Sequence, residues 1–128
     1  MPNTVLDPDL PLARLARATA CPTRSRSPTV AAEGGIATED DHERLDYLAS
    51  HLAALAQARA EAVDVRGYLH WSAFDNFEWS EGYRPRFGLV AVDDAFTRLP
   101  KPSAHAFARL ARTGRLDALH DLHERTPR

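Results

Sequence analysis

The sequence predicts an α/β protein with parallel strands, because two strand-then-helix units follow one another along the chain. An apolar, β-capable run at 29–32 precedes an amphipathic helix that begins near residue 38. A second extended run at 65–71 leads into an aromatic loop, a third extended run at 87–93 and a final helix after residue 102. A helix that connects two strands makes those strands parallel in one sheet.

The first strand, at 29–32, is short and apolar, which is typical of a strand buried inside a parallel sheet. It ends at Glu33, and Gly34 and Gly35 then allow a sharp turn of the backbone. The chain is therefore expected to change direction directly after an acidic residue at the end of a strand.

The first helix is predicted from leucines that recur at spacings of three and four residues and form one apolar stripe. They are Leu45, Leu48, Leu52 and Leu55. Thr38, with Asp41 three positions later, resembles a capping box, and acidic residues at 39–41 lie against the positive end of the helix dipole. We expect this helix to begin at Thr38 and to end between 60 and 63.

The second strand is expected at 65–71, and an irregular aromatic loop then continues to about residue 86. The next extended run, at 87–93, is followed by a turn at Asp93-Asp94. This turn indicates a short hairpin-like extension before the last helix.

The final helix has a candidate N-cap in Ser103 and a stop signal in Gly114. Outside the predicted α/β region, residues 1–28 are expected to form a poorly ordered segment with a short helix around 10–16. Residues 116–128 read as a tail of mixed charge.

Composition restricts the classes of partner. The net charge of −2 gives no reason to expect nucleic acid as a partner. The sequence lacks an apolar run of about 18 residues and a signal peptide, so we expect no membrane association and a cytoplasmic location. The single cysteine cannot form an internal disulfide, and the six histidines have no metal-site spacing, so neither a metal nor an organic cofactor is expected.

Aromatic and acidic residues are concentrated between Tyr68 and Phe87. This stretch holds both tryptophans, three of the five phenylalanines and two of the three tyrosines. The apolar face of a sugar stacks on an indole, and carboxylates bind its hydroxyl groups. Trp71, Glu78 and Trp79 therefore form a candidate carbohydrate site.

The run from Trp71 to Trp79, Trp-Ser-Ala-Phe-Asp-Asn-Phe-Glu-Trp, resembles the C-terminal signature of family 1 glycoside hydrolases, the β-glucosidase family. The resemblance covers roughly residues 28–110. It implies that Trp71 forms the floor beneath the sugar, that Glu78 accepts hydrogen bonds from distal hydroxyl groups and that Trp79 helps to bind the ring. Phe87 matches the aromatic residue that closes the same pocket.

The run Val-Ala-Ala-Glu-Gly-Gly-Ile-Ala around Glu33 resembles the strand-seven motif of the same family, commonly Val-Thr-Glu-Asn-Gly-Ile-Ala. The resemblance implies that Glu33 occupies the position of the catalytic nucleophile. Two positions depart from the motif: Ala32 replaces threonine and Gly34 replaces asparagine.

The family fold is a (β/α)8 barrel, which takes about 250 residues. With 128 residues, the chain is expected to hold only the last two β/α units, with residues 29–115 as a partial barrel that does not close. Two such strands leave open edges, so we expect marginal stability and a tendency to associate.

A retaining glycosidase needs a second carboxylate as acid/base, about 5–5.5 Å from the nucleophile. The family takes it from an Asn-Glu-Pro motif that this sequence lacks, so little or no hydrolysis is expected from the chain by itself. One hypothesis is a β-glucosidase-like retaining hydrolase that acts on a β-glucoside or related sugar with a complementary N-terminal chain. The alternative is a non-catalytic remnant or a small sugar-binding or interaction protein.

Other residues of the aromatic stretch are expected to be structural. Tyr68, Phe74 and Phe77 are predicted to be core residues. Asp75 is expected to shape the loop, and Arg86 to pair with a carboxylate beneath the site.

Overall fold

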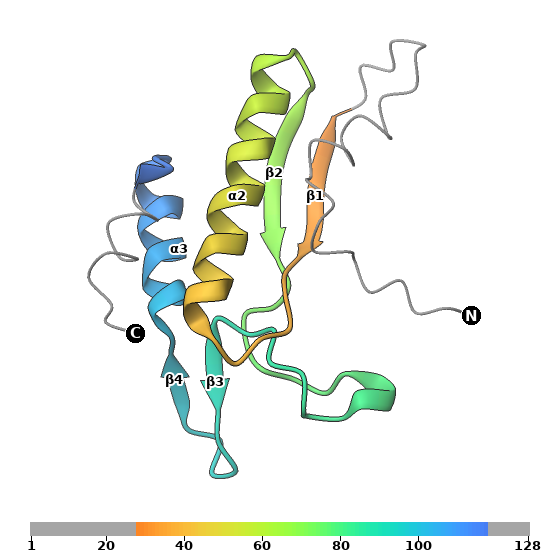
Figure 1. The fold of residues 1–128 in the computed structure, drawn as a ribbon, viewed down its shortest axis with the longest axis vertical. Helices are drawn as coiled ribbons and strands as arrows, with labels where there is room; N and C mark the ends of the chain where they lie inside the picture. Colours follow the sequence, from red (N-terminus) through yellow and green to blue (C-terminus); the bar gives the residue numbers. More distant parts are fainter. Residues whose placement is uncertain (1–27, 118–128) are drawn as a thin grey trace.

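The computed structural model describes residues 28–117 of the chain. The described part contains two β/α units, and a small hairpin lies between the strand and the helix of the second unit (Figure 1). In chain order the elements are β1 (Thr29–Gly34), α2 (Asp41–Ala60), β2 (Val65–His70), the 3-10 helix η1 (Trp79–Glu81), β3 (Val90–Val92), β4 (Arg98–Pro100) and α3 (Pro102–Thr113). This order confirms the α/β class predicted from the sequence. The predicted segment at 1–28, apart from residue 28, and most of the tail lie outside the described residues.

The strands β1 and β2 are parallel neighbours, as the intervening helix predicts. Thr29 pairs with Val65 and Gly34 pairs with His70. Because parallel strands in register end at the same edge of their sheet, the segments after Gly34 and after His70 emerge side by side. Figure 1 shows both strands beside α2, with the aromatic loop leaving the lower end of β2.

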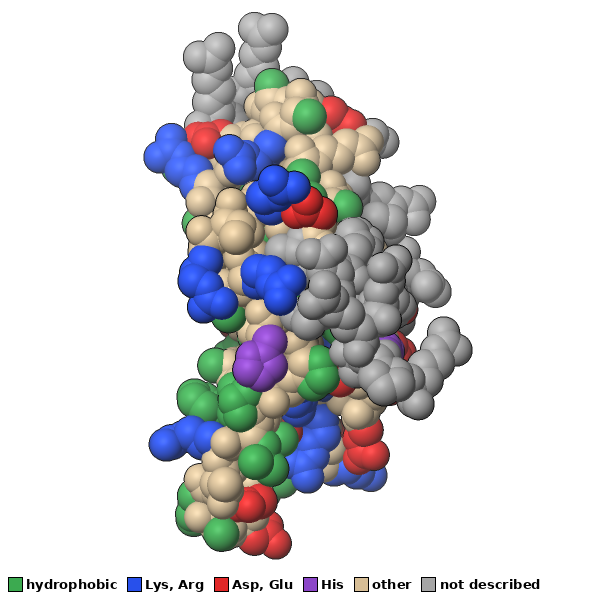
Figure 2. Space-filling model, turned by 90° about the vertical axis from the view of Figure 1, so that its left-hand side faces the viewer, with side chains coloured by type: hydrophobic (Ala, Val, Ile, Leu, Met, Phe, Trp, Pro, Cys, Tyr) green, Lys and Arg blue, Asp and Glu red, His purple; other side chains and the backbone are tan. Residues whose placement is uncertain are grey.

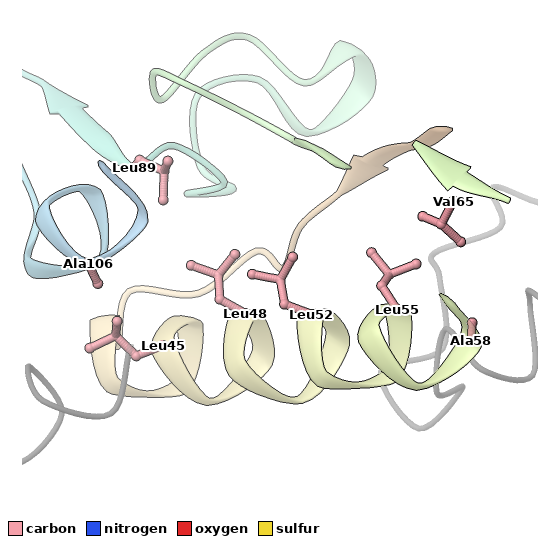
Figure 3. Packing of buried hydrophobic residues seen from close by; sticks show 8 residues of the cluster. All are labelled: Leu45, Leu48, Leu52, Leu55, Ala58, Val65, Leu89 and Ala106. Atoms are coloured by element: carbon pink, nitrogen blue, oxygen red, sulfur yellow. The ribbon is translucent and has the colours of Figure 1, made fainter. Parts of the chain in front are cut away.

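The core lies between α2, the strand β2, the residue just before β3, and α3 (Figure 3). It consists of Leu45, Leu48, Leu52, Leu55, Ala58, Val65, Leu89 and Ala106. The four leucines of the predicted stripe are all among these residues. Figure 3 shows them projecting from one side of α2 toward the strands and α3, which confirms the amphipathic helix.

The start of α2 differs from the prediction. The helix begins at Asp41, and its N-cap is Asp40, whose Oδ1 atom accepts a hydrogen bond from the backbone N–H of His42 at 2.9 Å. Thr38 lies before the helix, because its backbone N–H donates to the carbonyl of Arg86 and its Oγ1 atom accepts from the N–H of Asp40. The predicted capping box of Thr38 with Asp41 is therefore wrong by two positions.

The start of α3 also differs, while its end is confirmed. The N-cap is Lys101, with Pro102 in the first turn, and Ser103 lies inside the helix as a fully buried residue. Proline suits this position because a first-turn N–H has no partner within the helix. Gly114 ends the helix in the left-handed conformation, at φ 66°, as predicted.

The second face of the β1–β2 sheet is exposed in the described structure. Val30 is 52% and Leu69 is 60% exposed, whereas Ala31 and Tyr68 pack against the core cluster on the face toward α2. Strands buried on both faces carry apolar residues on both, so this sheet lacks one covering layer among the described residues. The described residues form no closed barrel.

Two of the three aromatic residues predicted to be core are exposed. Tyr68 packs against the core cluster, which confirms one prediction. Phe74 is 45% and Phe77 is 56% exposed, so the prediction is wrong for both in this structure. The physical reason is that the described residues supply no second layer over the aromatic loop.

The hairpin of β3 and β4 is antiparallel and projects beyond the core (Figure 1). Figure 2 shows the side of the molecule with α3 and this hairpin, where apolar side chains gather toward the hairpin end and basic side chains lie mainly above them. The exposed apolar residues of the hairpin include Phe96 and Leu99. None of the described helices has the length and apolarity needed to cross a bilayer.

Candidate functional site

Glu33 and Trp71 stand at the carboxyl ends of adjacent parallel strands. Gly34 pairs with His70 in the sheet. Glu33 precedes Gly34 and Trp71 follows His70, so both residues lie next to this pair. The backbone N–H of Trp71 donates a hydrogen bond to the carbonyl of Gly34 at 3.1 Å. Glu33 is exposed and has a left-handed backbone, at φ 60°. The structure thus brings the predicted nucleophile position and the predicted sugar floor to the same edge of the sheet.

Gly35 is required by the close approach of these two segments. A Cβ atom at this position would lie 1.8 Å from the carbonyl oxygen of Trp71, which is far inside van der Waals contact. Only glycine allows the backbone after β1 to pass this close to the end of β2.

Trp71 and Glu78 are in direct contact. The indole Nε1 atom of Trp71 donates a hydrogen bond to Oε1 of Glu78 at 3.1 Å. This bond fixes the carboxylate beside the indole ring, and Trp71 remains 40% exposed. A carboxylate can accept several hydrogen bonds, and Oε2 has no protein partner among the described residues, so Glu78 can still accept from the hydroxyl groups of a ligand.

Phe87 is brought next to the start of the loop by backbone pairing. The N–H of Ser72 donates to the carbonyl of Phe87 at 3.2 Å, and the N–H of Leu89 donates to the carbonyl of Ser72 at 3.0 Å. The pairing continues to Val90, whose carbonyl accepts from Asp75 at 3.0 Å. The peptide bond between Trp71 and Ser72 is cis.

Trp79 stands apart from the other predicted site residues. Its side chain is 87% exposed, and it opens the 3-10 helix η1. A hydrogen bond from the N–H of Glu78 to the carbonyl of Gly82, at 2.7 Å, closes this part of the loop. The structure therefore joins Trp71 with Glu78, and Glu33 and Phe87 with the segment around Trp71, while Trp79 projects into solvent.

Two residues beneath the site were not predicted to support it. The hydroxyl of Tyr68 donates to the carbonyl of Gly34 at 2.8 Å, and Nε2 of His70 lies 3.4 Å from the carbonyl of Phe87. Burial lowers the pKa of His70 to about 4, so its imidazole is neutral at pH 7. Their spacing of two along β2 puts them on one face of the strand, and that alternation was the available signal.

Asp75 is a nearly buried carboxylate in the aromatic loop, with its side chain 4% exposed. Its Oδ1 atom accepts from the N–H of Gly88 at 2.9 Å and from Nζ of Lys101 at 3.1 Å. Nη1 of Arg86 lies 3.8 Å from its Oδ2 atom. These contacts confirm that Asp75 shapes the loop and that Arg86 pairs with a carboxylate. Among residues 28–117 no cluster of three or more His, Cys, Asp or Glu side chains is arranged to bind a metal.

Comparison with known proteins identifies the family to which this chain belongs. The sequence profile of "Glycosyl hydrolase family 1" matches residues 27–115. The chain belongs to glycosyl hydrolase family 1. Its two β/α units correspond to the C-terminal part of a (β/α)8 barrel, because its structural neighbours are barrel β-glycosidases.

Relatives in family 1 are much longer than this chain. A β-galactosidase from Sulfolobus acidocaldarius is 47% identical over 87 residues, which cover 67% of this chain and 18% of that protein. The chain spans 15–18% of the length of the first curated relatives. A hyperthermophilic β-glucosidase from Pyrococcus furiosus superimposes with a TM-score of 0.78 at 40% identity, over 88% of this chain and 24% of that structure.

A β-glucosidase from Thermotoga maritima, solved in complex with methoxycarbonyl-substituted glucoimidazole, gives a TM-score of 0.74 at 31% identity. The alignment covers 79% of this chain and 25% of that structure. Family 1 enzymes with glucosidase and galactosidase names thus share the region that carries the candidate site.

Proposed function

We propose that this chain supplies the nucleophile position and part of the sugar subsite of a β-glucosidase-like retaining glycoside hydrolase. The observation that carries the proposal is the hydrogen bond between Trp71 and Glu78 at the strand end next to Glu33. A stacking surface, a hydrogen-bond acceptor and a second carboxylate at one sheet edge are what recognition and cleavage of a pyranoside require.

Sugar binding follows from the chemistry of Trp71 and Glu78. The indole offers its face to the C–H groups of a pyranose, and the Nε1–Oε1 hydrogen bond holds the carboxylate at the edge of that face. Glu78 then accepts hydroxyl donors, and hydrogen bonds to a charged acceptor are about twice as strong as neutral ones. Rings of the glucose, galactose or fucose type present hydroxyl groups that can donate to the Glu78 carboxylate.

The cleavage step assigns the nucleophile to Glu33. Its carboxylate attacks the anomeric carbon and forms a glycosyl ester, while the bond to the leaving oxygen breaks and that oxygen takes a proton from the acid. Water then attacks the same carbon, gives a proton to the conjugate base, and releases the sugar with retained configuration and Glu33 as a free carboxylate.

We assign the acid/base carboxylate to the other β/α units of the barrel. The exposed face of the β1–β2 sheet, with Val30 and Leu69, supports this, because strands of a parallel barrel are covered on both sides. The relatives that match this chain also contain several times its length. We therefore propose that activity requires a complementary N-terminal barrel segment.

The direct test measures hydrolysis of an aryl β-glucoside by the purified chain, with and without an added complementary segment. That segment is the Pyrococcus furiosus β-glucosidase truncated where its match to this chain begins. We expect turnover only with both polypeptides, and its loss in Glu33→Gln. Activity that is equal in the Glu33→Gln mixture would contradict the assignment of the nucleophile.

A second candidate is a non-catalytic protein that retains sugar binding, and the changes at Ala32 and Gly34 favour it. Both positions carry polar side chains in the family motif, whereas alanine and glycine have no polar side-chain atom that could orient a neighbouring carboxylate. Saturable binding of glucoimidazole without turnover in the reconstituted mixture would favour this candidate over the enzyme.

A further inference from the structure

The aromatic loop is attached to the rest of the molecule by a pair of opposite charges far apart in sequence. Asp75 lies in the loop, and Lys101 lies at the start of α3. Nζ of Lys101 is 3.1 Å from Oδ1 of Asp75, and their side chains are 16% and 4% exposed. This is an ion pair largely withdrawn from water, so removal of one partner weakens the compensation of the other, mostly buried charge.

Both charged groups also bind the backbone of Gly88, which directly follows Phe87. The N–H of Gly88 donates to Asp75, and the carbonyl of Gly88 accepts from Nζ of Lys101 at 2.6 Å. The backbone N–H of Lys101 donates to the carbonyl of Leu89 at 3.0 Å. The pair therefore holds both hydrogen-bonding groups of the residue directly after Phe87.

The backbones of the two loop segments touch at this point. A Cβ atom on Gly88 would lie 2.1 Å from the backbone nitrogen of Asp75 and 2.3 Å from the carbonyl carbon of Phe74. The pairing of Ser72 with Phe87 and Leu89 begins directly beside this contact. A shift at Asp75 would therefore be transmitted to the residue that follows Trp71.

The positive charge of Lys101 is supported by Asp75, because other features of its environment disfavour the charge. Burial lowers the pKa of Lys101, and the positive charge of Arg44 lowers it further. The hydrogen bond and charge of Asp75 raise the pKa again, as does the charge of Asp41. Asp75 thus supports the charged form of an ammonium group that its environment disfavours.

We propose that Asp75 and Lys101 are positioning residues that hold Trp71 and Glu78 in their sugar-binding geometry, so that α3 controls the arrangement of the aromatic loop. The role of Trp71 and Glu78 in sugar binding rests on the proposed function, whereas the control of their geometry does not. Neither Asp75 nor Lys101 needs to touch a sugar for this role.

The test of geometry uses the full 128-residue chain with Trp79→Phe, which leaves Trp71 as the only indole. Asp75→Asn and Lys101→Met are compared in this background by near-ultraviolet circular dichroism and by acrylamide quenching of Trp71 fluorescence. We expect the quenching constant to rise about twofold in each variant as the Trp71–Glu78 contact loosens. The matched control is Asp64→Asn, which breaks the exposed ion pair of Asp64 with Arg66 and should leave both signals unchanged.

The double variant Asp75→Asn/Lys101→Met separates positioning from simple loss of stability. It removes both buried charges and leaves only the partly exposed Arg86 without its carboxylate, so we expect it to fold better than either single variant and still to show the altered Trp71 signals. Samples are compared at low temperature, where far-ultraviolet circular dichroism confirms the helices. Wild-type Trp71 signals in the folded double variant would overturn the proposal.

Sugar affinity is measured by calorimetry with glucoimidazole in chains that retain both tryptophans. We expect the dissociation constant to rise about tenfold in Asp75→Asn, which corresponds to the loss of one hydrogen bond to a charged group. Absence of binding by the unmodified chain mixed with the complementary barrel segment would count against the proposed function alone, because the Trp71 signals test the positioning independently. Unchanged affinity together with unchanged Trp71 signals in Asp75→Asn would contradict the positioning role of Asp75 and Lys101.

Discussion

Asp41 of α2 accepts two hydrogen bonds from Ser103 of α3. The backbone N–H of Ser103 lies 2.7 Å from Oδ2, and its hydroxyl lies 2.7 Å from Oδ1. A carboxylate of one helix thus caps the first turn of the other, where unpaired N–H groups and the helix dipole favour a negative charge. The same Asp41 pairs with Arg44, whose side chain is fully buried.

Substitution Asp41→Ala is expected to destabilise the protein by about 3 kcal/mol or more, because it removes the cap of α3 and leaves the Arg44 guanidinium with only carbonyl partners. Ser103→Ala should cost about 1 kcal/mol, since the backbone N–H of residue 103 keeps its acceptor. Urea denaturation followed by circular dichroism measures both. Equal losses in the two variants would argue against the buried Arg44 as the source of the difference.

The apolar stripe of α2 provides a second prediction. Leu48 is completely buried, so Leu48→Ala should cost about 2–5 kcal/mol through lost contacts and a residual cavity. Leu69→Ala is the control, because Leu69 is exposed on the open face of the β1–β2 sheet and should cost little. A large loss for Leu69→Ala would instead indicate that another polypeptide surface covers this face in solution.

The acid sensitivity of the fold should depend on His70. Burial lowers its pKa from 6.5 to about 4, so the native state disfavours the proton that the unfolded chain binds. The stability that the neutral imidazole contributes is fully present above about pH 6.5 and is lost as the pH falls toward about 4. Below that value both states are protonated and the loss stops growing.

The measurement compares urea denaturation of the unmodified chain and of His70→Gln between pH 7.5 and 4. The free energy of unfolding should fall more steeply for the unmodified chain across this window. His51, whose pKa burial also lowers, adds to the slope in both proteins and so cancels in the comparison. Parallel pH curves for the two proteins would show that His70 is not responsible.

The sequence predicted the elements better than the contacts between them. The leucine stripe, the strand order and the stop at Gly114 follow from local periodicity and backbone chemistry, and the structure has all three. Both helix starts were misassigned, because Thr38 bonds to Arg86 and Ser103 bonds to Asp41, contacts between residues distant in the chain.

In the candidate site, too, the positions of the elements could be predicted from the sequence better than the contacts between them. Convergence of Glu33 with Trp71 is predictable, since parallel strand ends meet at one edge. The pairing of Asp75 with Lys101, 26 residues apart, depends on how α3 packs, and no local pattern in the sequence encodes it. Exposure of Phe74 was unpredictable for a related reason, because burial depends on the layers that surround a loop.

Gly34 provides the last prediction, because its departure from the family motif has a structural counterpart. A Cβ atom on Gly34 would lie 2.6 Å from Cε2 of Tyr68 and 2.8 Å from its hydroxyl oxygen. The ring of Tyr68 thus occupies the space that a side chain at residue 34 would need. Gly34→Ala should therefore force the ring to move and weaken its hydrogen bond to the carbonyl of residue 34, with a loss of about 1–3 kcal/mol.

Gly67→Ala is the matched control for this substitution, since its Cβ would lie 3.6 Å from the nearest side-chain atom of Val30, an ordinary contact. Tyr68→Ala should remove the clash, so that Gly34→Ala costs less in the Tyr68→Ala background than in the unmodified chain. A double-mutant cycle from urea denaturation measures this coupling, and additive effects would mean that Tyr68 does not fill the space at residue 34. Coupling of the expected sign would show that the ring of Tyr68 fills the space beside Gly34 and so suits glycine at this position.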